Sequence, residues 1–334
     1  MRDLDILMAV IQTGSMGKAA EQLNIFQPAV SKAIANLEHT LRVPLLERGR
    51  HGVEPTPYGV ALARRGAAVF DELQQGVQDV EFIADPTAGE VRIGTTENMM
   101  GGLLPEIISR ISLRHPRISF LVSQGPSSLE QFRELREREA DLILGRLPQT
   151  IDGDDLDVQI LFEDPFLIGT GKHNHRWAKR RRIDLSELMD ELWVLPRPNR
   201  PVGKLVADIF RASGLCIPPK HVACSSMQMS NALLGTGRYV GMYSGSYLRF
   251  SEMGQSIKVL PVALRVQSSP VGIVALKKRV LNPVTQLFIE FAQEVVKPLR
   301  TDKYAARQPG RNILNSREEG VRGRAGIAGL GRNR

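Results

Sequence analysis

Residues 15–48 constrain this chain most, because they predict two short amphipathic helices that meet at a sharp turn. Ser15 suits the N-cap of the first helix, and Pro28 lies in the first turn of the second, where a missing N–H costs nothing. The apolar positions of both helices recur at helical spacing: Met16, Ala19, Ala20 and Leu23 in the first, and Val30, Ala33, Ile34 and Leu37 in the second.

The opposite face of the second helix carries small and polar residues. Such a face lets a helix approach a DNA groove closely while short side chains reach base edges. The candidate major-groove contacts are Gln27, Pro28, Ser31 and Lys32. Helix pairs with this spacing also occur in ordinary helical domains, so the spacing alone leaves that alternative open.

The segment after the second helix favours the DNA-reading interpretation. Residues 45–55 read as a two-stranded hairpin whose tip is rich in glycine and basic residues, as in a winged helix-turn-helix. Arg48, Arg50 and His51 are the candidate contacts to the DNA backbone or the minor groove. The alternative for these three side chains is a solvated charge cluster.

These motifs closely resemble those of the LysR-type family of bacterial transcriptional regulators. The matching positions are Ala19-Ala20, Leu23, Gln27-Pro28-Ala29, Ser31, Ile34, Leu37-Glu38, Pro44-Leu45-Leu46-Glu47-Arg48 and Pro55-Thr56. The resemblance covers residues 2 to about 299. It implies an α/β chain with an N-terminal winged helix-turn-helix, a long linker helix and a two-lobed effector domain like that of periplasmic binding proteins.

One position departs from the family pattern. Phe26 stands where the family has a serine, so the second helix lacks a side-chain oxygen at its N-cap. Losing such a cap costs about 1 kcal/mol, and a bulky ring at a surface meant for phosphate also hinders docking. We therefore expect DNA binding to be weakened, not abolished.

Residues 57–85 predict one long helix, because Thr56 and Pro57 begin it and no further proline occurs before Pro86. Its apolar residues alternate steps of three and four, as in a coiled-coil seam. We expect this seam to form a dimer, since operators with two half-sites need two reading heads; packing against the chain's own body is the alternative. The seam residues are Ala63, Gly66, Phe70, Leu73, Val77, Val80 and Ala84.

From Glu90 onward the pattern changes to short apolar strands that alternate with helices, which predicts parallel sheets with right-handed crossovers. The expected strands are 91–94, 118–124, 141–145, 193–195, 221–225, 239–243, 257–262 and 271–276, and the expected helices are 102–114, 127–138, 203–213, 227–235 and 283–296. Together with the resemblance, this alternation predicts a DNA-binding head over 1–58, a linker helix and hinge over 59–88, and an effector domain over 89–300. Its first lobe comprises 89–162 and 266–300, its second 163–265, and a basic tail covers 301–334.

Ligands of open α/β sheets bind beyond the carboxyl ends of the strands, and a cleft between two lobes is a natural small-molecule site. Hydroxyl groups with an arginine nearby suit a carboxylate or a polyol. Capping of the following helices is the alternative role for each single Ser or Thr. The candidate effector contacts are Thr95, Thr96, Ser127, Arg146, Ser225 and Ser226.

We expect the chain to be cytoplasmic. The formal charge is +8, and residues 303–334 contribute most of it, with eight Lys or Arg and two Glu. This Gly- and Arg-rich tail is expected to be disordered. The two cysteines do not suggest a secreted framework, and the chain shows neither a signal segment nor a membrane span.

Two classes of function compete. The first is a DNA-binding regulator that responds to a small-molecule inducer; the second is a solute-binding or enzymatic two-lobed protein with an incidental helical domain. We expect no catalysis, because no nucleophile, base or metal constellation is persuasive, and we expect no cofactor or metal besides the inducer. The resemblance also implies a homodimer or homotetramer that recruits RNA polymerase and bends DNA differently when the inducer binds.

Overall fold

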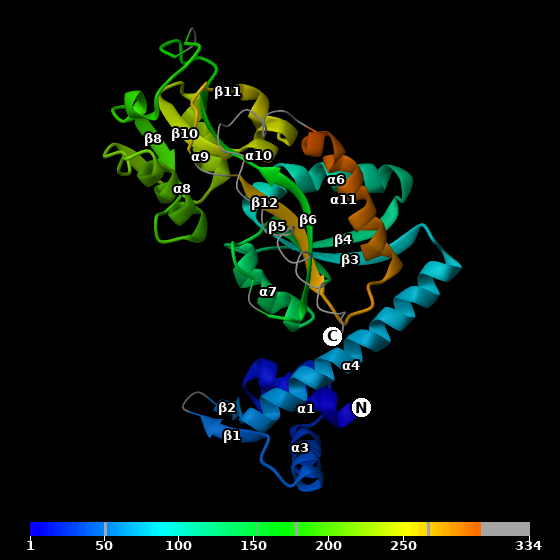
Figure 1. Ribbon diagram of the computed structural model, residues 1–334. Coiled ribbons are helices and arrows are strands. Elements are labelled where there is room, and N and C mark those ends of the chain that lie inside the picture. Colours follow the sequence, from blue (N-terminus) through cyan, green and yellow to red (C-terminus); the bar gives the residue numbers. More distant parts are fainter. Residues whose placement is uncertain (50–51, 152, 178–179, 266–267, 302–334) are drawn as a thin grey trace, which may run out of the picture.

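The computed structural model describes residues 1–49, 52–151, 153–177, 180–265 and 268–301. Figure 1 shows a small helical head, one long helix leading away from it, and a body of two α/β lobes. Arg50 and His51, and the tail from residue 302, lie outside the described residues, so the expectations for them stay predictions.

The head is the predicted winged helix-turn-helix. Its apolar spacing buries Val30 and Ile34 of the second motif helix against Leu7 and Val10 of the first helix of the chain. The hairpin strands pair antiparallel from Leu46 with Pro55 to Gly49 with Gly52. The elements are α1 (Arg2–Thr13), α2 (Met16–Gln22), α3 (Gln27–Leu41), β1 (Leu46–Gly49) and β2 (Gly52–Pro55).

The long helix α4 (Pro57–Ala84) begins where the sequence predicts. The Gly59 N–H donates to Thr56 Oγ1 at 3.2 Å, which satisfies a helix-start donor. Gly59 packs so closely on the hairpin that a Cβ there would lie 2.0 Å from the Leu45 carbonyl oxygen. The start of α4 is therefore fixed to the head, and Figure 1 shows its far end beside the first lobe.

The first lobe is a five-stranded sheet in the order β4-β3-β5-β12-β6. Its first three strands are parallel, as expected, but β12 runs antiparallel to both β5 and β6, so the sheet as a whole is mixed. The strands are β3 (Ala88–Thr95), β4 (Arg117–Gln124), β5 (Leu142–Arg146), β6 (Leu156–Asp164) and β12 (Ser269–Leu276). The sequence reading missed β6.

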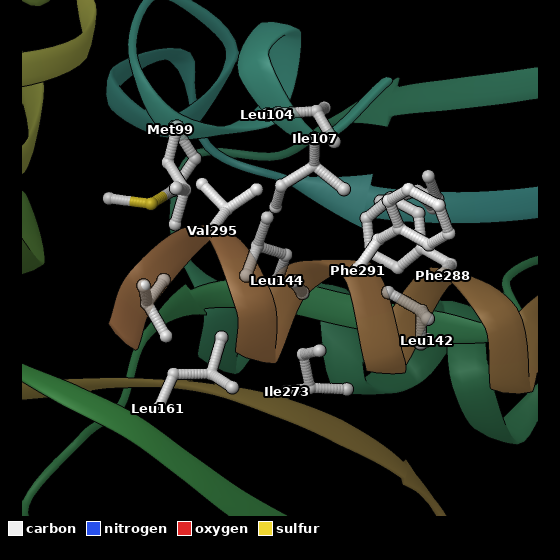
Figure 2. Packing of buried hydrophobic residues seen from close by; sticks show 14 of the residues in the cluster. Met99, Leu104, Ile107, Leu142, Leu144, Leu161, Ile273, Phe288, Phe291 and Val295 are labelled. Carbon is white, nitrogen blue, oxygen red and sulfur yellow. The ribbon is translucent and has the colours of Figure 1, made fainter. Parts of the chain in front are cut away.

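Helices cover both faces of this sheet, because neighbouring residues of a strand point to opposite sides. Leu142, Leu144 and Ile273 pack under α6 (Leu103–Arg114) and α11 (Pro283–Thr301), whereas Ile143 and Val274 pack under α7 (Ser128–Arg136). Figure 2 shows Phe288, Phe291 and Val295 of α11 among the side chains of the sheet and of α6.

The second lobe is a five-stranded sheet in the order β11-β7-β10-β8-β9, and it too is mixed. Strands β8, β9 and β10 are parallel, while β7 runs antiparallel to β10 and β11. The chain passes from β6 into β7 at Pro165. The elements are β7 (Phe166–Gly171), β8 (Leu192–Leu195), α8 (Pro201–Ala212), β9 (His221–Ala223), α9 (Met227–Gly235), β10 (Tyr239–Ser244), α10 (Gly245–Phe250) and β11 (Ile257–Val259). Strand β7 was not expected.

Candidate functional site

The four candidate major-groove residues lie together on α3. Gln27, Pro28, Ser31 and Lys32 are exposed, whereas Val30 and Ala33 of the same helix are buried in the head. The Ser31 hydroxyl donates to Met16 Sδ at 3.4 Å and so touches the preceding helix. The structure therefore presents a polar helix face on a rigid core.

Phe26 is the N-cap residue of α3, and no side-chain hydrogen bond caps that helix. Its ring is 86% exposed and stands at the edge of the polar face. By contrast, the N-cap Ser15 of α2 accepts a hydrogen bond from the Lys18 N–H at 3.5 Å. The departure seen in the sequence is thus a missing cap and an unburied aromatic ring.

Replacing Phe26 with serine is expected to tighten DNA binding about fivefold, because a restored cap stabilises the helix by about 1 kcal/mol. Fluorescence anisotropy with one operator fragment measures the change. Phe26→Ala is the matched control, because it removes the ring without supplying a hydroxyl. Equal affinities for Phe26→Ser and the parent would show that the substitution is harmless.

The hairpin is tied to the head by backbone contacts. Glu38 Oε1 accepts hydrogen bonds from the N–H groups of Leu45 and Leu46 at 2.7 and 3.2 Å, and the Val53 N–H donates to the Gly14 carbonyl at 2.9 Å. Arg48 of β1 is exposed on this anchored hairpin. Arg48 and Gln27, the first residue of α3, line one hollow of the head.

A hollow of about 540 Å³ lies between the start of α2, the start of α3 and the hairpin. Gln27 and Arg48 line it, together with Lys18, which the sequence reading had not singled out. Glu47 also lines the hollow, so its two basic side chains, Lys18 and Arg48, outnumber one acidic side chain. Basic side chains and an amide suit contacts with the phosphate backbone of DNA. The signal for Lys18 was available, since it follows the Ser15 cap in the first turn of α2.

The expected seam of α4 divides into two parts. Gly66 is buried, and a Cβ there would lie 2.9 Å from the side chain of Leu4 in the chain's own head. Further along, Val77 and Val80 are 58% and 67% exposed, and Leu73 is also exposed. The part around Gly66 therefore packs against the chain's own head. The part from Leu73 to Val80 is an exposed apolar strip.

The effector candidates of the first lobe lie at the ends of β3 and β5 and at the start of α7. Thr95 is buried, and its hydroxyl donates to the Leu144 carbonyl at 2.7 Å. Thr96 is the N-cap of α5 (Glu97–Met100) without a side-chain cap bond, and Ser127 caps α7 by accepting from the Glu130 N–H at 3.3 Å. The neighbouring Ser128 hydroxyl is buried and has no hydrogen-bond partner among the described residues.

The candidates of the second lobe follow β9. Ser225 is exposed, and Ser226 caps α9 by accepting from the Met229 N–H at 3.3 Å. The lobes touch here, because the N–H of Met227 donates to Glu97 Oε1 of the first lobe at 2.8 Å. Thr96 precedes Glu97 in the chain, and Ser226 precedes Met227. The structure thus brings Thr96 and Ser226 to one interlobe junction.

Arg146 is paired within the protein. Its guanidinium lies 3.1 Å from the carboxylate of Asp164 and also donates to the Asp164 carbonyl at 2.8 Å. Burial raises the pKa of the Asp164 carboxyl, an effect that Arg146 and Ser246 oppose. Asp164 ends the unexpected strand β6, so the sequence reading gave no reason to pair it with Arg146.

A polar network continues from this pair to the other lobe. Ser246 donates through its N–H and its hydroxyl to the Asp164 carboxylate at 2.9 and 2.7 Å, and its hydroxyl lies 3.2 Å from that of Ser244. Ser244 in turn contacts Asn98 of the first lobe. Asn98, Asp164 and Ser244 are therefore junction residues that sequence reasoning missed. Glu97 follows the first predicted strand but was not among the candidate contacts.

Two family descriptions match the chain. "Bacterial regulatory helix-turn-helix protein, lysR family" matches residues 1–60, and "LysR substrate binding domain" matches residues 84–297. This chain belongs to the LysR family. As a LysR-family transcriptional regulator it binds DNA through its head and a small-molecule effector through its body, so the solute-binding or enzymatic alternative is not favoured.

The LysR-family assignment agrees with individual relatives. The regulator GbpR of Azospirillum brasilense is 27% identical over 287 residues, which cover 85% of this chain and 82% of that protein. BenM of Acinetobacter baylyi is 29% identical over 252 residues, covering 74% and 80%. Among the described residues, no helix is long and apolar enough to cross a membrane.

Solved structures share the fold of this LysR-family chain. A full-length OxyR variant from Pseudomonas aeruginosa has a TM-score of 0.62 at 21% identity, covering 88% of this chain and 94% of that one. CbnR complexed with its target DNA has a TM-score of 0.59 at 19% identity, covering 88% and 99%.

Proposed function

We propose that this LysR-family regulator reads its operator with α3 in the major groove and with the hairpin on the DNA backbone. Gln27, Pro28, Ser31 and Lys32 supply the base contacts, and Arg48, Arg50 and His51 add affinity with little sequence information. The observation that supports this most is the exposed polar face of α3 over a buried apolar core. Lys18 joins the backbone contacts from the hollow beside Arg48.

The effector part of the proposal places a small molecule where the two lobes meet. Thr95, Thr96, Ser127, Arg146, Ser225 and Ser226 remain the candidate residues around that junction. Effector binding changes the arrangement of the lobes and of the subunits in a dimer or tetramer, and hence the bend of the DNA and the recruitment of RNA polymerase. The protein acts in the cytoplasm by binding, without catalysis, metal or cofactor.

Footprinting on the DNA upstream of the protein's own gene tests both parts. We expect a protected stretch with the wild type and about tenfold weaker protection with Lys32→Ala, since one good base contact contributes about 1–3 kcal/mol. Lys204→Ala is the matched control, because Lys204 is exposed on α8, in the second lobe. Equal protection by Lys32→Ala and Lys204→Ala would contradict the assigned reading face.

The same footprint carries the effector test. Sugars, aromatic acids and other organic acids are added in turn, and at least one is expected to change the length or the hypersensitive positions of the protected stretch. A footprint that none of these compounds changes would count against an effector site for them at the junction.

A further inference from the structure

Glu97 makes a contact that its place in the sequence does not predict. It begins the short helix α5 directly after β3 of the first lobe, yet its carboxylate accepts the N–H of Met227, 130 residues away, at 2.8 Å. Met227 is the first residue of the nine-residue helix α9 in the second lobe. Its N–H has no partner within that helix, and the helix dipole favours a negative charge there.

Further contacts hold the lobes together beside Glu97. The Asn98 side-chain amide donates to Ser244 Oγ at 2.8 Å, and Ser244 is buried. Tyr247 of α10 packs so closely on Gly101 that a Cβ at Gly101 would lie 2.8 Å from the ring. We call the contacts of Glu97, Asn98 and Gly101 with the second lobe the interlobe latch.

We propose that Glu97 is a specificity-determining residue, which closes the interlobe latch with the chain's own carboxylate and so excludes anionic effectors from the junction. The proposal rests on the proposed function, in which the effector binds where the lobes meet. It assigns to the effector the chemistry of a neutral polyol, whose hydroxyl groups donate to the carboxylate and accept from backbone N–H groups.

Charge explains why an anion is excluded. A second carboxylate or phosphate near Glu97 meets a like charge at short range, which weakens its binding about tenfold or more. It also competes with a tethered carboxylate, whose effective concentration is high because it belongs to the same chain. The buried guanidinium of Arg146 does not offset this repulsion, because it is already paired with Asp164 at 3.1 Å.

A ligand without a negative charge avoids this repulsion, and a polyol is such a ligand. Hydroxyl groups can still bond to Glu97, because a carboxylate accepts several hydrogen bonds.

Hydrogen exchange of the full-length protein, read by mass spectrometry in a peptide spanning residues 225–235, tests the latch. Glu97→Ala is expected to speed exchange in this peptide about tenfold, because a hydrogen bond to a charged group is lost. Glu130→Ala is the matched control, since Glu130 is exposed in the first turn of α7. Glu97→Gln keeps the shape of the side chain and guards against a general loss of folding in Glu97→Ala.

Acetate then tests the exclusion of anions. Molar acetate, with chloride as the control for ionic strength, is expected to slow exchange again in Glu97→Ala and to leave the wild type unchanged. Equal exchange in the wild type and Glu97→Ala would overturn the latch. Acetate that acts on both proteins alike, or on neither, would overturn the exclusion. These readouts use no DNA and no effector, so their failure is distinguishable from failure of the proposed function.

Discussion

Replacing Asp71 with alanine is expected to lower the free energy of unfolding by about 3–5 kcal/mol, because several guanidinium groups lose a buried anionic partner. Asp71 lies on α4, and its carboxylate contacts Arg92, Arg138 and Arg279 of the first lobe at 3.2, 2.9 and 2.7 Å. The Arg279 side chain is only 1% exposed. Without Asp71, Arg92 and Arg279 would share the single carboxylate of Asp141, and the excess positive charge at that depth is costly because water does not replace the lost partner.

The same contacts fix the linker helix on the body. Asp141 shares Arg92 and Arg279 with Asp71, at 2.7 and 2.6 Å, so the two carboxylates form one cluster with three arginines. Without Asp71 the cluster loses the only one of these residues that belongs to α4. The variant should therefore free the far half of α4 from the first lobe and weaken any coupling between effector and DNA.

Urea unfolding followed by circular dichroism measures the stability loss. Hydrogen exchange in residues 68–84 reports whether α4 leaves the lobe. Asp79→Ala is the matched control, because Asp79 lies on the same helix but outside the cluster. If Asp71→Ala and Asp79→Ala unfold at the same urea concentration, the cluster does not stabilise the fold.

The head could be predicted from the sequence because all its signals are local. The spacing of Val30, Ala33 and Ile34, the proline at position 28 and the glycine-rich hairpin each specify backbone conformation within a few residues. The missing cap at Phe26 was predictable for the same reason. The structure adds that the ring stays exposed, which depends on how the head packs.

The body was predicted less well because strand direction and strand pairing depend on distant segments. Strand β6 was missed although Val158 and Ile160 alternate with polar residues, as in a half-buried strand. It pairs with β12, which arrives after the whole second lobe and runs antiparallel to it. No local pattern distinguishes that direction from a parallel crossover.

Charged partners were the hardest feature to predict. Arg146 was expected beside a ligand, yet the structure pairs it with Asp164, at the end of the unpredicted strand. Glu97 reads as an ordinary acidic residue at a helix start, where it suits that helix's own dipole. That its carboxylate instead reaches α9 of the other lobe follows from the arrangement of the lobes, which periodicity does not encode.

Val77→Asp is expected to dissociate the protein into subunits and to weaken operator binding about 100-fold or more. Val69, Leu73, Val77, Val80 and Ile83 form an exposed apolar strip on α4, at steps of three and four residues. A helix of this kind buries its strip against a second copy. Loss of the second reading head removes the avidity gained from binding two half-sites, which is about 100- to 10,000-fold in linked pairs.

Val77→Asp acts at the seam of a symmetric dimer, because both subunits carry the new aspartate there. Each subunit would bring one aspartate into the helix pair, and each aspartate would lose water that it needs to stay charged. Sedimentation velocity measures the oligomeric state, and anisotropy with a two-half-site and a one-half-site fragment separates lost avidity from a damaged head. Gln74→Asp introduces the same residue at an exposed position of α4 outside the strip and should leave both measurements unchanged. A Val77→Asp protein that sediments and binds like Gln74→Asp would show that subunits associate through another surface.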